Sequence, residues 1–262
     1  MNCNKPASIS FSFEGFSRRG GQTDEHSDGW GIAFFEDRGC RLIVDDKSSV
    51  TSPLAELVKR YPVKSCNVVA HIRKATQGPV ALENSHPFMR ELWGRYWVFA
   101  HNGHLKHYAP ALTGAFRPVG DTDSERAFCF LMQGLHTRFG DEAPSLDALH
   151  GALQELTAEI ATHGVFNFLL SNGEALFAHC STHLHYVTRQ YPFTRAHLVD
   201  CELSIDFNDH NHLDDCITII ATKPLTSNEN WVAFAPGELK VFHNGAARLT
   251  GLREVREFAV AC

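Results

Sequence analysis

The order of its predicted elements is the feature of this sequence that most constrains the fold. Strands come first, a pair of helices follows, and strands then return, with the segments at residues 28–37, 39–46, 64–73, 95–100 (strands), 123–139, 145–164 (helices) and 165–245 (further strands). Several strands are apolar almost throughout, which is typical of strands covered on both faces. The sequence therefore predicts an α+β fold in which two stacked, mainly antiparallel sheets lie between helices, as four layers.

The composition argues against several classes of function. No apolar run approaches the ~20 residues that span a bilayer, and the N-terminus lacks the apolar segment of a signal peptide. The net charge is −6 and the 24 Lys and Arg are scattered, so we expect neither a nucleic-acid nor a membrane partner. Because no composition break divides the chain, we predict one cytoplasmic domain, residues 1–262.

The cysteines and histidines give no metal or cofactor signal. The eight Cys stand singly, without a C-x-x-C pair, which indicates reduced thiols rather than a disulfide framework. Histidines gather at His101, His104 and His107 and again at His183 and His185. Neither group comes with the Cys or carboxylate pattern of a zinc site, so we expect no metal and no cofactor.

Arg73 is the first candidate for a binding residue. It follows a buried strand and opens a Pro- and Gly-bearing segment, residues 74–94, and loops of that length are usually functional. A guanidinium at a strand end beside Thr76 suits a two-point clamp on a carboxylate. Taken alone, Arg73 also fits an ordinary surface arginine.

Two further positions extend this candidate site. Asp123, at a helix start, can cap the helix or accept a hydrogen bond from a substrate ammonium. Asn102-Gly103, after the predicted strand 95–100, can form a hairpin turn or supply a side-chain and a backbone N–H as an oxyanion hole. Glycine permits the close approach that such a hole needs. Together with Arg73, these residues describe a site for an α-amino acid whose side-chain carbonyl is attacked.

The sequence resembles the class II (Ntn-type) glutamine amidotransferases, most closely their YafJ-like branch. The matching stretches cover nearly the whole chain: RRGGQTDEHSDGWGIAFF, VVAHIRKATQG, ENSHPF, RELWGRYWVFAHNGHL, FRPVGDTDSERAF, GVFNFLLSNG, STHLHYVTR, IATKPLTSNENW and PGE. The resemblance implies an Ntn-hydrolase-like αββα sandwich. It also implies hydrolysis of the γ-amide of glutamine through a thioester on an N-terminal Cys.

The resemblance also implies roles for individual residues. Arg73 matches the arginine that binds the glutamine α-carboxylate, with Thr76 beside it, and Asp123 matches the acid that binds the α-ammonium. Asn102 and Gly103 match the oxyanion hole. The SHPF segment that contains His86 lies near the site in the family, so we count His86 as a candidate binding residue, with a purely structural role as the alternative.

The family nucleophile is a Cys that becomes residue one after removal of the initiator Met. This chain begins Met1-Asn2-Cys3, and Met1 resembles the second Met of the family start Met-Cys-Glu-Leu-Leu-Gly-Met. We therefore expect that Cys3 is not the nucleophile and that the native product is about six residues longer. A form that begins at Met1 is expected to be inactive.

Two other functions fit the same residues. One is a γ-glutamyl amidohydrolase acting on glutathione-like compounds, because Arg73 and Asp123 would hold that γ-glutamyl group equally well. The other is a catalytically silent module that binds glutamine or a γ-glutamyl compound. In each case the partner is a small molecule, and any ammonia acceptor would be a separate protein that the sequence does not identify.

Overall fold

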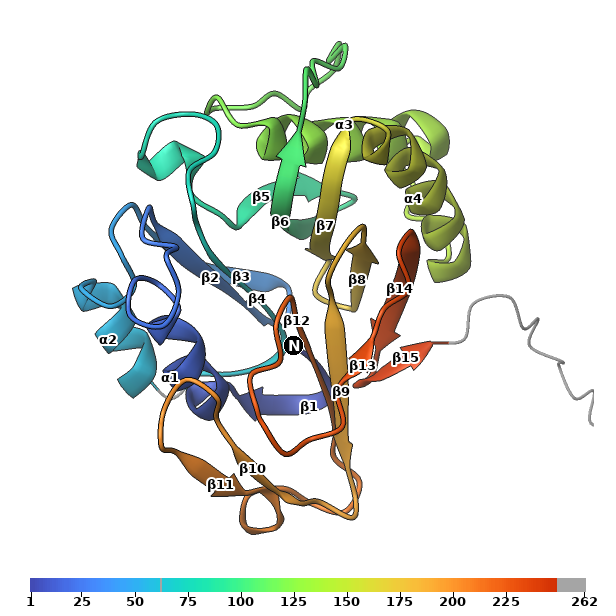
Figure 1. Cartoon of the computed structure of the whole chain (residues 1–262). Helices are drawn as coiled ribbons and strands as arrows, with labels where there is room; N and C mark the ends of the chain where they lie inside the picture. The colour runs from blue at the N-terminus through green and yellow to red at the C-terminus, as the bar shows by residue number, and fades with distance from the viewer. Residues whose placement is uncertain (62, 249–262) are drawn as a thin grey trace, which may run out of the picture.

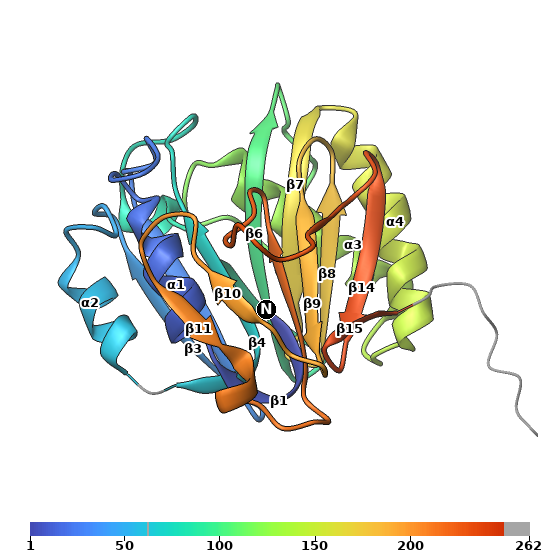
Figure 2. The same ribbon diagram turned by 60° about the horizontal axis from the view of Figure 1, so that its bottom comes forward.

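Two stacked sheets with helices on their outer sides make up the fold (Figure 1). The computed structural model describes residues 1–61 and 63–248, so residue 62 and residues 249–262 of the predicted domain lie outside the described residues. Figure 2 shows the two sheets between helical layers. Every strand pair in the described part of the chain is antiparallel. The predicted α+β four-layer sandwich is confirmed.

The two sheets differ in size. In spatial order, the first contains β13 (Val232–Ala233), β9 (His185–Gln190), β12 (Cys216–Ala221), β1 (Asn2–Ser8), β4 (Lys64–Ile72), β2 (Trp30–Glu36) and β3 (Gly39–Asp45). The second contains β15 (Ala246–Arg248), β14 (Glu238–His243), β8 (Ala175–Cys180), β7 (Gly164–Ser171), β6 (Arg95–Leu105) and β5 (Phe88–Leu92). A separate small ribbon pairs β10 (Arg195–His197) with β11 (Ser204–Asp206).

The helices lie in two pairs. One pair, α1 (Ser10–Arg18) and α2 (Pro53–Arg60), lies beside the first sheet, and the other, α3 (Asp123–Phe139) and α4 (Leu146–Ala161), covers the second (Figure 2). Short 3-10 turns occur at η1 (Leu82–Asn84) and η2 (Phe207–Asp209). Within the described residues, no helix combines the length and apolar character that crossing a bilayer requires.

Apolar side chains fill all three spaces between the four layers. Phe13 of α1 meets Trp30 of β2 with ring centroids 5.8 Å apart, and Phe128 of α3 stacks on Phe99 of β6 at 5.2 Å. Between the sheets lies a third cluster, which includes Val69, Val98, Leu176, Ala178 and Phe242. Strands such as β2 and β8 are thus covered on both faces, which explains their nearly continuous apolar sequence.

The structure differs from the sequence prediction in the first residues of the chain. Neither β1 nor α1 was predicted. The residue before α1, Ile9, offers no side-chain cap, so the usual start signal is missing, and Gly15 in the middle of the helix lowers its intrinsic helix propensity. Helix α1 is stabilised instead by tertiary packing of Phe13 against the first sheet.

Candidate active site

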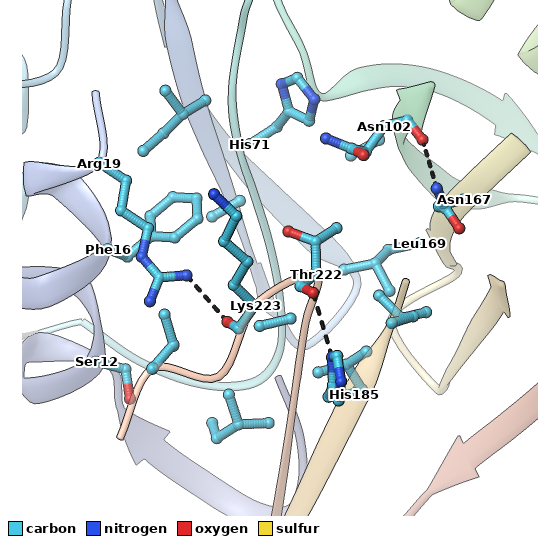
Figure 3. A pocket seen from close by; sticks show the side chains of 18 of the residues that line it. Ser12, Phe16, Arg19, His71, Asn102, Asn167, Leu169, His185, Thr222 and Lys223 are labelled. Atoms are coloured by element: carbon cyan, nitrogen blue, oxygen red, sulfur yellow. Dashed lines mark hydrogen bonds between the residues drawn. The ribbon is translucent and has the colours of Figure 1, made fainter. Parts of the chain in front are cut away.

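A cavity of about 530 Å³ lies at the N-terminal end of β1, between the strands β4 and β12. Met1 forms its floor, β4 contributes Val68, Ala70 and Ile72 to one wall, and β12 contributes residues 219–221 to the opposite wall. Because β1 lies between β4 and β12 in the sheet, this cavity continues the line of β1 beyond Met1. Figure 3 shows side chains that line it, among them His71, Asn102 and Asn167.

The edge of β4 that faces this cavity is open. Met1 and Val68 exchange both backbone hydrogen bonds, at 2.8 and 2.9 Å, so the backbone groups of Val68 point toward β1. In an antiparallel strand every second residue points the same way, which directs the N–H and C=O of Ala70 and Ile72 into the cavity. Among the described residues, β1 has none left to pair with them. The cavity is therefore a slot that an additional stretch of strand could enter.

Asn102 and Gly103 lie within strand β6. The predicted strand end at Ala100 is wrong, since β6 continues to Leu105, and Asn102-Gly103 is not a hairpin turn. The two residues pair with Asn167 and Phe166 of β7. A Cβ atom at Gly103 would lie 1.9 Å from the Val165 carbonyl oxygen, so only glycine allows the strands to approach this closely.

Beyond Phe99, β6 has β7 as its only described neighbouring strand. The pairing with β5 covers Arg95 to Phe99 only, which leaves the other edge of residues 100–105 open. The N–H of Leu105 points to that open edge, where it donates to the Asp123 carboxylate at 2.7 Å. Strand alternation directs the N–H of Gly103 to the same edge. Asn102 itself is exposed and lines the cavity.

Asp123 connects α3 to β6. Its carboxylate accepts hydrogen bonds from the N–H of Leu105 and from the N–H of Ser124, at 2.7 and 2.9 Å, and it is 5% exposed. Of the two roles considered for Asp123, capping of the helix is wrong, because the side chain of Thr122 is the cap and accepts from the N–H of Glu125. Asp123 is thus a buried carboxylate with further acceptor capacity on both oxygens.

Arg73 follows β4 directly and is buried, with 3% of its surface exposed. Its guanidinium donates to three carbonyl oxygens: Gln77 at 3.1 Å, Gly78 at 3.4 Å and Asp28 at 3.4 Å. None of the described carboxylates forms an ion pair with it, and burial lowers its pKa. Its hydrogen-bond acceptors are all neutral carbonyls, and the charge of the nearby Asp28 only partly offsets its burial, so the guanidinium is suited to receive an anionic ligand.

Gln77 joins Arg73 to the segment that contains Asn102 and Gly103. Its backbone oxygen accepts from Arg73, and its side-chain amide lies 3.4 Å from the carbonyl oxygen of Leu105. Because the Leu105 N–H in turn donates to Asp123, a chain of hydrogen bonds connects the predicted carboxylate and ammonium binders. Thr76 lies next to Gln77 with its side chain exposed.

His86 belongs to a buried aromatic group. Its ring lies 4.2 Å from that of His71 and 4.5 Å from that of Phe88, centroid to centroid, and 4% of the residue is exposed. Both ring nitrogens lack a hydrogen-bond partner among the described residues. Burial lowers the pKa of His86 well below its usual value, as it lowers the pKa of His71 to about 3. His86 thus lies behind His71, which itself faces the cavity.

We expect this pair of neutral histidines, of which His86 is buried and His71 partly buried, to make the fold sensitive to acid. In the unfolded chain both imidazoles titrate near pH 6.5, and the lowered folded-state pKa means that below this pH the unfolded chain binds more protons. Stability is therefore complete above about pH 6.5 and is lost as the pH falls toward 3. At pH 5 His71 alone should lower the free energy of unfolding by about 2 kcal/mol relative to neutral pH.

Urea unfolding at pH 7 and pH 5 measures this loss. Replacing His71 with Gln should reduce it, whereas the same change at the exposed His210 should leave it as it is. Equal unfolding free energies at the two pH values would contradict the expectation.

Two residues of the site escaped the sequence analysis. His71 lines the cavity. Its only signal in the sequence is its place two residues before Arg73, a spacing that directs both side chains to the same face of an extended chain. Asn167 also lines the cavity, and its signal is an amide inside the otherwise apolar strand β7. From the sequence alone, neither signal tells whether the side chain faces the cavity. That depends on how the two sheets pack against each other.

The fold is shared with a domain of a much larger solved structure. Glutamine phosphoribosylpyrophosphate amidotransferase from B. subtilis superposes with a TM-score of 0.56 at 13% identity, over 94% of this chain and 47% of that one. At that identity the likeness concerns the fold alone, which is Ntn-hydrolase-like.

Comparisons of sequence specify the family. The profile of the class II glutamine amidotransferases matches residues 1–261. YafJ of Escherichia coli, which is assigned to the glutamine amidotransferases, is 51% identical over 92% of this chain and 95% of its own length. A relative from Haemophilus influenzae with the same assignment is 53% identical over 94% of this chain and 83% of its own.

A solved structure agrees with this. A predicted glutamine amidotransferase from Pseudomonas aeruginosa is 45% identical and has a TM-score of 0.72, over 88% of this chain and 90% of that one. The chain belongs to the class II glutamine amidotransferase family, in its YafJ-like branch.

Proposed function

We propose that this protein hydrolyses the γ-amide of glutamine through a thioester on an N-terminal Cys. The observation that carries the proposal is the open edge of β4, which leads from Met1 to the buried Arg73 and passes beside Asn102. The charged groups of the site would bind the α-amino acid end of glutamine, and its hydrogen-bond donors would bind the amide end. Its charged α-carbon end would lie between Arg73 and Asp123, and its amide would lie at Asn102.

Each predicted residue has a role in this proposal. Arg73 would clamp the α-carboxylate with Thr76 beside it, because its charge has no carboxylate partner among the described residues. Asp123 would accept from the α-ammonium with its remaining lone pairs. The side chain of Asn102 and the N–H of Gly103 would stabilise the oxyanion. His86 would shape the pocket wall behind His71.

The nucleophile would come from residues ahead of Met1 that extend β1 along β4. Met1 lies opposite Val68, so a residue five positions earlier would lie opposite Arg73 if the register continues. Its thiolate would attack the amide carbon, with the thiol proton passing to its own α-amine and then to the departing ammonia. Water would cleave the resulting thioester, release glutamate and restore the thiol.

Cys3 is unsuited to this task. It is 3% exposed, it donates to the Ser65 carbonyl at 3.2 Å, and burial raises its pKa to about 12. A thiol is nucleophilic as the thiolate, which a pKa of about 12 suppresses at neutral pH. Cys3 also lies at the opposite end of β4 from Arg73.

Two forms of the protein test the proposal. One begins at Met1, and the other carries Met-Cys-Glu-Leu-Leu-Gly ahead of it. We expect glutamate release from glutamine by the longer form only, and loss of that activity when its N-terminal Cys is replaced by Ser. The intact mass of the protein from its native host should match the longer form after Met removal. A folded longer form that neither releases ammonia nor forms a thioester would contradict the proposal and favour the silent binding module.

A second candidate activity has one observation in its favour. The γ-glutamyl-hercynylcysteine sulfoxide hydrolase of Mycolicibacterium smegmatis is 31% identical over 58% of this chain and 60% of its own length. Arg73 and Asp123 would hold the γ-glutamyl group of such compounds equally well. Comparing kcat/KM of the longer form for glutamine and for γ-glutamyl thiols distinguishes the two activities, and a preference for the thiols would replace the glutaminase assignment. If the protein is a glutaminase, a separate partner protein would accept the ammonia that it releases.

A further inference from the structure

Asn167 of β7 is a buried amide whose side chain forms hydrogen bonds with two other segments of the chain. It lies opposite Asn102 in the pairing of β6 with β7, and 2% of its surface is exposed. Its Nδ2 donates to the backbone carbonyl of Asn102 at 3.0 Å and to the Thr182 hydroxyl at 3.0 Å. Its Oδ1 accepts from the N–H groups of Ser181 and Thr182, at 2.8 and 3.0 Å. Figure 3 shows the bond from Asn167 to Asn102 at the cavity wall.

This arrangement fixes the backbone of Asn102 from the side opposite the open edge of β6. Among the described strands, only β7 pairs with β6 at this point, so few other contacts determine how far Asn102 reaches into the cavity. The same amide ties β6 to residues 181–182, which follow β8. All four hydrogen-bonding positions of the Asn167 side chain are therefore used, as burial of an amide requires.

We propose that Asn167 is a positioning residue for the oxyanion hole. It would act through Asn102, by holding the carbonyl of that residue so that its side-chain amide and the following N–H of Gly103 stay aimed at the reacting carbonyl. Asn167 would itself touch no reacting atom. The inference rests on the proposed glutamine hydrolysis, in which an error of about 1 Å in such a group costs about 10²-fold in rate.

The substitutions Asn167→Asp and Asn167→Ala test this in the form that carries the N-terminal Cys. The Asp variant keeps the acceptor for residues 181–182 but loses the donor to Asn102, and the Ala variant loses both. We expect kcat for glutamine to fall about tenfold to a hundredfold in at least the Ala variant, with KM within about twofold of the parent, because the ground state is held by Arg73 and Asp123.

Asn172→Asp is the matched control. Asn172 follows the far end of β7, and its Oδ1 accepts from the N–H groups of Glu174 and Ala175 at 3.1 and 2.9 Å, as the Oδ1 of Asn167 does at residues 181–182. The same chemical change there should leave kcat unaltered, which separates positioning from a general effect of the substitution on the strand.

A double variant distinguishes positioning from a merely structural role. If Asn167 acts through Asn102, Asn102→Ala with Asn167→Ala should be no slower than Asn102→Ala alone. Multiplicative losses, or folded single variants with the parent kcat, would overturn the inference while leaving the glutaminase assignment intact. Absence of turnover in the parent form would instead overturn both.

Discussion

Replacing Asn102 with Ala in the form that carries the N-terminal Cys is expected to lower glutaminase kcat by about 10²–10³-fold. The side-chain amide would donate to the oxygen that becomes negative in the tetrahedral intermediate, and that interaction strengthens only as the charge develops. Ground-state binding should therefore change little, so KM stays near the parent value. Steady-state release of glutamate measures both quantities.

The structure makes Asn102→Ala a clean substitution. The bond from Asn167 goes to the backbone carbonyl of Asn102, so removing the Asn102 side chain leaves it in place. Asn102 is exposed to the cavity, and truncation should cost little stability. A variant with the parent kcat and an unchanged unfolding midpoint would leave Asn102 as an ordinary strand residue.

The second large effect concerns ligand binding and does not require catalysis. Arg73→Ala should weaken the binding of glutamate by about 1.5–3 kcal/mol, or roughly tenfold to 150-fold in Kd, because in the proposed site it would remove a charge-assisted contact to the α-carboxylate. Asp123→Asn should weaken binding to a similar degree, because it would remove the charge that is proposed to face the α-ammonium. Titration calorimetry with glutamate measures both losses. It is carried out on the form that begins at Met1 and on the longer form that carries the N-terminal Cys.

Arg95→Ala serves as the control for the arginine substitution. Arg95 pairs with Glu174 on the surface, where about half of each side chain is exposed, so its loss should leave glutamate affinity unchanged. Unchanged affinity in both the Arg73 and the Asp123 variants would show that the ligand, if one binds, is held elsewhere. Circular dichroism of Asp123→Asn must accompany the titration, because Asp123 also accepts the Leu105 N–H.

Local signals in the sequence predicted helix α3 well. The bounds of α3, Asp123–Phe139, agree with the predicted helix, because an amphipathic run follows a cluster of capping residues. The strands β2 and β8 were predictable for a related reason, since burial on both faces demands apolar residues at nearly every position. Such patterns depend on near neighbours in the chain or on burial alone.

Elements that depend on distant partners were not predictable in this way. Helix α1 lacks a side-chain cap and owes its stability to Phe13 against Trp30, and β1 is a strand because it fills the space between β4 and β12. The segment after Arg73 was predicted as one long loop, yet it contains η1 and the strand β5, which pairs with β6. Strand pairing is a long-range property, so composition alone does not reveal it.

The sequence by itself determined the layers of the fold and the chemical types available at the site: a guanidinium after a buried strand, a carboxylate at a helix start, and an Asn-Gly pair. Only the tertiary structure decided how they could cooperate. Pairing of β5 with β6 stops at Phe99 while β6 continues to Leu105, and this difference leaves the Gly103 N–H on an open edge beside Asp123. The physical reason is that the direction of each backbone N–H depends on which strand lies alongside, and that strand is chosen by contacts far apart in the chain.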